Sequence, residues 1–190
     1  MFIALGFAAA LAAGAPPAAA QAQPAGQTFA FAAYLIRGYH NLQQNLLAAA
    51  EKMPDADYSF RPTPQVRPFG QLVSHVALAQ FGSCAALKGE ADPKKDVKED
   101  APRSKAEQIE LLKASTAYCD PVLESLTDQA LTETFKSGQN TVAKGLVLTG
   151  TNSHGNEMYG TMAVYLRLKG IVPPTTEKEM AAKSKDQAKI

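Results

Sequence analysis

The sequence contains no tryptophan, only two cysteines and three histidines, and its 19 basic and 18 acidic residues almost cancel. A formal net charge of +1 gives no excess of basic residues of the kind that nucleic-acid binding needs. The sequence also lacks a glycine-rich phosphate loop, a Cys-x-x-Cys pair and a Gly-x-Ser-x-Gly elbow. Nucleotide binding, dithiol redox cycling and serine hydrolase chemistry therefore have no support in the sequence.

No segment alternates polar and apolar residues with the two-residue period of a strand, and no internal repeat occurs. Hydrophobic residues make up 46% of the 190-residue chain, so it is long enough for one domain with a substantial core. These features indicate an ordinary globular domain built from helices.

The first residues differ in composition from the rest of the chain. Residues 2–13 form an apolar run, Pro16 and Pro17 interrupt it, and Ala20-Gln-Ala22 has the small-x-small form that a signal peptidase cleaves. We predict that residues 1–22 are a secretory signal and that the protein is periplasmic or secreted. A membrane anchor is the alternative, but the apolar run is too short to span a bilayer.

Apolar residues at helical spacing predict four amphipathic helices, over residues 29–52, 69–87, 104–126 and 141–169. The polar segment between the second and third helices, 90–103, has no apolar period and is expected to cross the surface. This pattern is typical of an all-α four-helix bundle with up-down-down-up topology and a long crossover between helices two and three. We expect the bundle to cover residues 29–174, and residues 175–190 to form a flexible polar tail with little to bury.

The two cysteines test this topology. If the second and third helices are parallel, Cys84 and Cys119 lie at a similar height along the bundle, because each is about 15 residues from the start of its helix. Export would place them in an oxidising compartment, where a disulfide persists. The alternative is two buried free thiols that act as small apolar side chains.

Four glycines recur every five residues in the last predicted helix, namely Gly145, Gly150, Gly155 and Gly160. Each would weaken an isolated helix, so we expect close packing against neighbours to compensate. The sequence leaves open whether these neighbours lie in the bundle or in the second subunit of a homodimer.

The same helix carries His154, with Met158 one turn later. Positions four residues apart share one helix face, about 6 Å apart, and two histidines at that spacing can bind one metal ion. Only one imidazole is present here. The other two histidines are His40, which we expect to be a partly buried structural residue, and His75 in the second helix.

Three segments resemble the DinB-like proteins, a group of metal-binding four-helix bundles, and the resemblance extends over about residues 33–174. The segments are Met53-Pro-Asp-Ala-Asp-Tyr-Ser-Phe-Arg-Pro-Thr-Pro64, Arg67-Pro-Phe-Gly-Gln-Leu-Val-Ser-His75 and His154-Gly-Asn-Glu-Met-Tyr-Gly160, followed by Tyr165-Leu-Arg-Leu-Lys-Gly-Ile-Val-Pro-Pro174. The resemblance implies a metal site with one histidine on the second helix, matching His75, and two on the fourth, matching His154 and Met158. The third histidine is thus replaced by methionine.

This replacement leaves several interpretations open. His75 and His154 alone would bind zinc or nickel weakly, and Glu157 could add a carboxylate. Met158 could bind a soft ion such as Cu(I), or it could fill the space in a protein that binds no metal.

If the protein is an enzyme, the resemblance points to hydrolysis or thiol transfer with a small molecule that the sequence does not identify. The alternative is a metal-free binding or structural bundle without catalytic activity. We expect no nucleic-acid partner, and no membrane association of the mature domain.

Overall fold

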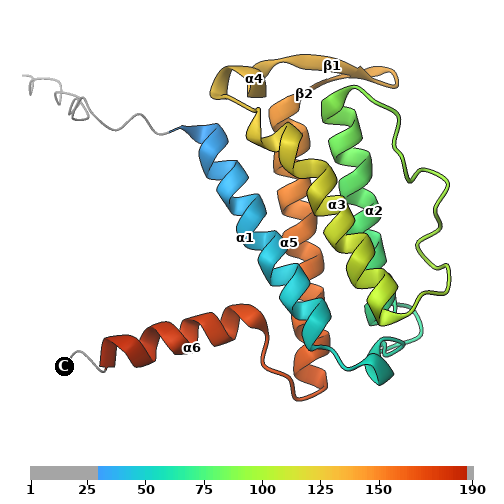
Figure 1. The fold of residues 1–190 in the computed structure, drawn as a ribbon, viewed down its shortest axis with the longest axis vertical. Helices are drawn as coiled ribbons and strands as arrows, with labels where there is room; N and C mark the ends of the chain where they lie inside the picture. The colour runs from blue at the N-terminus through green and yellow to red at the C-terminus, as the bar shows by residue number, and fades with distance from the viewer. Residues whose placement is uncertain (1–29, 188–190) are drawn as a thin grey trace, which may run out of the picture.

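The computed structural model describes residues 30–187, and its largest feature is a bundle of four long helices (Figure 1). These are α1 (Phe31–Lys52), α2 (Phe69–Lys88), α3 (Lys105–Glu124) and α5 (Lys144–Leu168). The remaining elements are η1 (Asp55–Asp57), α4 (Asp128–Thr132), β1 (Thr134–Ser137), β2 (Asn140–Ala143) and α6 (Pro174–Gln187). The predicted all-α class is confirmed. Within the described range, no helix is long and apolar enough to cross a membrane. The predicted signal, residues 1–22, lies outside it.

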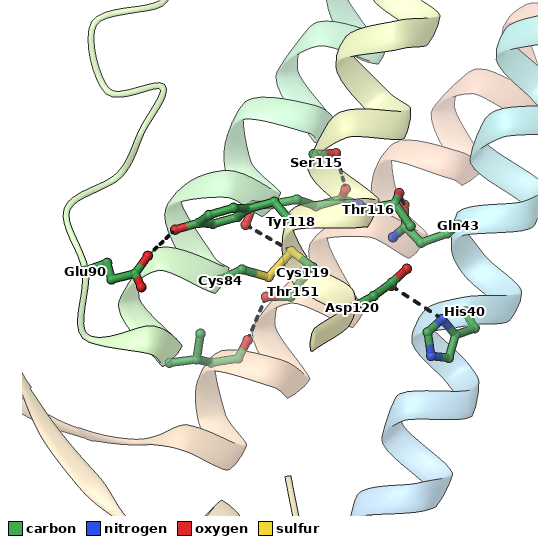
Figure 2. The surroundings of a disulfide bond; sticks show 12 residues. His40, Gln43, Cys84, Glu90, Ser115, Thr116, Tyr118, Cys119, Asp120 and Thr151 are labelled. Carbon is green, nitrogen blue, oxygen red and sulfur yellow. Dashed lines mark hydrogen bonds and ion pairs between the residues drawn. A yellow bond between two sulfur atoms is a disulfide. The ribbon is translucent and has the colours of Figure 1, made fainter. Parts of the chain in front are cut away.

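Helices α2 and α3 run side by side in the same direction, and the linker between them returns along the outside of the bundle (Figure 1). α1 and α5 pack against this pair and run in the opposite direction. A disulfide joins Cys84 to Cys119, whose Cα atoms are 5.3 Å apart (Figure 2). The disulfide that the heights of the two cysteines predicted is therefore present, and it ties α2 to α3.

The core consists of two hydrophobic clusters with a polar layer at the level between them. One cluster includes Leu46, Phe69 and Leu166, and the other includes Tyr39 and the disulfide. In the polar layer, the Gln80 Nε2 donates to Gln43 Oε1 at 2.9 Å, and the Ser115 hydroxyl donates to Gln80 Oε1 at 2.7 Å. Because these buried amides bond to one another, the layer links α1, α2 and α3 across the centre of the bundle.

The fourth long helix starts at Lys144 and not at residue 141, because residues 140–143 form a strand. Strands β1 and β2 pair antiparallel, and the turn between them contains Gly138 with a φ of 58°. Each strand has only four residues and is largely exposed. A strand that buries neither face needs no alternation of polar and apolar residues, and the sequence therefore did not predict it.

Within the segment 175–190 that we predicted to be a flexible polar tail, the structure contains the helix α6 (Pro174–Gln187). Proline suits the first position of a helix, and the Ala, Lys and Glu residues that follow favour helix formation. Polar contacts tie the start of α6 to α1: Lys52 donates to Glu177, and Lys178 Nζ donates to Asn45 Oδ1 at 2.7 Å. Local propensity and a few polar contacts thus favour a helix in a segment that buries almost nothing.

Only two of the four regularly spaced glycines are packed closely. A Cβ atom added at Gly155 would lie 2.5 Å from Leu42 Cδ2, and one added at Gly145 would lie 3.0 Å from the Leu131 carbonyl oxygen. A Cβ atom at Gly150 or Gly160 would meet nothing within 4 Å. The expectation of close packing therefore holds for Gly145 and Gly155 alone.

We predict opposite effects of alanine at these positions. Gly150→Ala and Gly160→Ala should each raise the free energy of unfolding by about 0.5–1 kcal/mol, because alanine loses less backbone entropy in a helix. Gly155→Ala should lower it by about 1–3 kcal/mol, because the buried Leu42 must move. Urea denaturation of the three variants measures the difference, and a stabilising Gly155→Ala would contradict the packing described here.

Candidate metal centre

The structure brings His75 on α2 and His154 on α5 together, although they are 79 residues apart in the sequence. Their Nε2 atoms lie 3.0 Å apart, and the ring centroids lie 5.0 Å apart with the rings tilted by 68°. Both side chains are partly buried. Antiparallel packing of α2 against α5 brings the two imidazoles together in an edge-to-face arrangement, with their Nε2 atoms toward each other.

Glu99, in the linker between α2 and α3, holds His75 from the opposite side. Its Oε2 lies 2.6 Å from His75 Nδ1, while its Oε1 accepts hydrogen bonds from Arg67 Nε and Gln71 Nε2, both at 2.9 Å. A carboxylate only accepts hydrogen bonds, so the proton of a neutral His75 lies on Nδ1. The lone pair of His75 Nε2 is then directed toward His154.

The ionisation states suit a site that binds a cation. Burial of the His154 ring lowers its pKa, a protonated His75 and Arg67 lower it further through their positive charge, and Glu157 opposes them. Burial alone would raise the pKa of Glu99, but hydrogen bonds from Arg67 and His75 outweigh it and lower the pKa. His154 is therefore neutral and Glu99 is ionised near neutral pH.

Met158 and Glu157 differ in their surroundings. Met158 is 8% exposed and belongs to the hydrophobic cluster that contains Leu46 and Phe69. Glu157 is exposed to solvent, although its charge reaches His154. The packing of Met158 suits a side chain that fills apolar space, and Glu157 lies at the rim.

His40 is not brought to the histidine pair. It lies on α1 with its Nδ1 3.8 Å from Asp120 Oδ1 (Figure 2). Its ring also packs edge-on against the ring of Tyr39. Burial raises the pKa of Asp120, and the charge of His40 opposes this shift. His40 is partly buried, as expected from the sequence, and its structural role stays a prediction.

The distance between the two histidine Nε2 atoms can be compared with the distance expected between two nitrogens that bind one metal ion. Two imidazole nitrogens, each about 2.0–2.1 Å from one ion, lie about 2.9–3.4 Å apart for bond angles between 90° and the tetrahedral value. The 3.0 Å between the two Nε2 atoms falls in this range. Among residues 30–187, however, no group of three or more His, Cys, Asp and Glu side chains is placed to hold one ion. The chain thus offers two nitrogen ligands and not the usual three.

Glu99 is the residue of this site that the sequence analysis missed. It lies in a linker rich in Lys, Asp and Pro, where neighbouring carboxylates at Asp96 and Asp100 have the same local character. No periodicity or spacing within the sequence distinguishes it from them. Its role depends on how the linker folds back over the start of α2.

Comparisons with known proteins agree with this fold. The family model described as the DinB superfamily matches residues 39–160. A DinB-like protein from Bacillus cereus ATCC 10987 superposes with a TM-score of 0.61 at 20% identity, over 74% of this chain and 93% of that one. A DinB-like protein from Bacillus subtilis superposes with a TM-score of 0.59 at 21% identity, over 72% of this chain and 92% of that one.

A conserved protein from Enterococcus faecalis gives a TM-score of 0.59 at 14% identity, over 74% of this chain and 98% of that one. No curated protein matches the sequence. Identities at this level show a shared fold and leave the reaction to be argued from the residues of the site.

Proposed function

The chain belongs to the DinB superfamily, and from this premise we propose that its bundle binds one divalent metal ion, zinc or nickel, through Nε2 of His75 and Nε2 of His154. The observation that supports the proposal is the approach of these two atoms to 3.0 Å, with Glu99 bonded behind His75. Proteins of this superfamily generally bind metal, and carboxylates behind metal-binding histidines are usual.

A bound ion would supply Lewis acidity that activates a water molecule or a thiol, so we propose hydrolysis or thiol transfer as the reaction class. The residues of the chain would prepare the site. Glu99 keeps the His75 proton on Nδ1, burial keeps His154 neutral, and Met158 provides an apolar wall in place of a third histidine. The missing ligand leaves additional positions on the ion for water or substrate.

In one variant of this proposal the ion is a soft one such as Cu(I), and the Met158 sulfur binds it together with the two histidines.

A second candidate function needs no metal. The same 3.0 Å separation fits a hydrogen bond from His154 Nε2 to His75 Nε2, and Met158 is packed as a core residue. On this alternative the protein is a binding or structural bundle without catalytic activity.

We also propose that the protein is exported to the periplasm or secreted. Two features support this location: the composition of residues 1–22, and a buried disulfide that a reducing cytosol would not maintain.

Elemental analysis tests the metal proposal. We expect the mature protein, purified without a His-tag or chelator, to contain about one equivalent of metal, and His75→Ala to contain none. His40→Ala is the matched control, because it removes a histidine outside the pair and should retain the metal.

Met158→His separates the two candidate functions. Metal in both the natural protein and Met158→His supports a working two-histidine site. Metal in Met158→His alone would favour the metal-free alternative, because the bundle would then provide the geometry but the natural side chains would not.

A further inference from the structure

A pocket of about 310 Å³ lies between α1 and α3, apart from the histidine pair, which lies between α2 and α5. The residues that line it include His40, Gln43, Leu47, Leu112, Thr116 and Asp120. Figure 2 shows the polar side chains of this set extending from the two helices toward one another. Because α1 and α3 are antiparallel, the polar residues gather at one end of the pocket and the two leucines at the other.

The Gln43 amide holds a hydrogen-bond donor without a partner. Its Oε1 accepts from Gln80 Nε2 at 2.9 Å and from the Thr116 hydroxyl at 3.3 Å, so the oxygen end of the amide is turned to these two residues. Gln43 is only 6% exposed, and its Nε2 has no hydrogen-bond partner within residues 30–187. A buried N–H group without a partner costs free energy, which an acceptor on a ligand would recover.

Asp120 holds an acceptor without a partner at the same end of the pocket. Its Oδ1 is buried, and no N–H or O–H group of the described chain donates to it. His40 Nδ1, at 3.8 Å, is too distant for a hydrogen bond. Burial raises the pKa of the Asp120 carboxyl, the charge of His40 opposes this shift, and the charge of Glu124 adds to it. A donor on a ligand would therefore stabilise this carboxylate.

We propose that this pocket binds a small aliphatic amide, whose carbonyl oxygen accepts from Gln43 Nε2, whose N–H donates to Asp120 Oδ1 and whose alkyl group packs against the two leucines. An amide carries a donor and an acceptor side by side, and the protein presents one donor and one acceptor that do not bond to each other. A carboxylate has no donor, and an ammonium group has no acceptor. Both protein atoms lie just beneath the pocket surface, and a turn of the His40 ring, whose side chain is 38% exposed, opens Oδ1 to the ligand.

Four ligands of similar size test this proposal in nuclear magnetic resonance titrations of the mature protein: butanamide, methyl propyl ketone, butanoate and butylammonium. We expect butanamide to bind at least about tenfold more tightly than each of the others, because each of them leaves one buried group without a partner. Equal or tighter binding of any of the other three would overturn the proposal. So would the absence of butanamide binding, because water then bonds to both groups and no ligand replaces it.

Asp120→Ala should weaken the binding of butanamide about tenfold or more and leave that of methyl propyl ketone unchanged, because only the amide uses the carboxylate. Damage to the shape of the pocket would instead weaken both ligands alike, and that result would overturn the proposal. Glu124→Ala is the matched control, because the charge of Glu124 reaches Asp120 but the residue does not line the pocket. An equal loss of butanamide binding in Glu124→Ala would also overturn it.

Ala117→Leu tests the place of binding. Ala117 is exposed and lines the pocket, so a leucine side chain there should fill part of it and weaken butanamide binding about tenfold or more. Ala114→Leu is the matched control, because Ala114 is an exposed alanine on the same helix that does not line the pocket. Circular dichroism shows whether both variants are folded. Unchanged binding in folded Ala117→Leu would show that the amide binds elsewhere and overturn the proposal.

The metal function and this site can fail separately, because the pocket and the histidine pair lie between different helices. Asp120→Ala should keep the metal content of the natural protein, and His75→Ala should keep its affinity for butanamide. Binding of butanamide by a protein without metal would support the pocket and reject the metal site. Loss of butanamide binding in a folded His75→Ala protein would place the amide at the histidine pair and overturn this proposal.

Discussion

Removal of the disulfide, by Cys84→Ala together with Cys119→Ala, is expected to lower the free energy of unfolding by roughly 3–4 kcal/mol, because the bond closes a loop of about 35 residues. Folded domains are typically stable by only about 5–15 kcal/mol. Alanine is a better replacement than serine, because both cysteines are buried and a serine hydroxyl there could not form a hydrogen bond with water. The loss is therefore a large part of the total stability.

Urea denaturation with and without reductant measures this effect. Reduction of the natural protein should reproduce the double variant, whereas reductant should leave the double variant unchanged. A loss below about 1 kcal/mol would mean that α2 and α3 are held in register without the bond. The loop includes the whole linker that carries Glu99, so the reduced protein should also bind metal more weakly.

The four long helices are predictable from the sequence because each buries one face, and burial of a helix face repeats with the helical period. The disulfide is predictable for a related reason: once two helices are taken as parallel, the rise per residue sets the heights of Cys84 and Cys119. The β1–β2 hairpin and α6 bury little, so no hydrophobic pattern marks them. The hairpin forms through hydrogen bonds between its two strands, and α6 forms through the helix propensity of its residues.

The candidate site is only partly predictable. His75 and His154 can be selected because histidines are few and the family resemblance places them on the right helices. Glu99 cannot, because its position beside His75 depends on the path of a linker without periodicity. The packing of the glycines also escapes sequence analysis: Gly150 and Gly155 look alike in the sequence, yet Leu42 packs against Gly155 and not against Gly150.

Glu99→Gln is expected to weaken binding of zinc or nickel by about 10–100-fold while leaving the helical content unchanged. Glutamine has the shape of glutamate but no charge, and its amide can turn an N–H toward His75 Nδ1. That orientation favours a proton on Nε2, which removes the lone pair that the metal needs. Competition with a chromogenic chelator measures the change in affinity, and nitrogen chemical shifts of His75 report which ring nitrogen carries the proton.

Glu157→Gln is the control that shows whether position or charge matters. It removes a carboxylate whose charge also reaches His154 but which does not contact His75. We expect it to change affinity far less than Glu99→Gln does. Equal losses would mean that the site needs only negative charge nearby, and a larger loss in Glu157→Gln would identify Glu157 as a ligand. Equal losses would therefore reject the role of Glu99 as the residue that orients His75, because that role depends on the direct contact between Glu99 and His75.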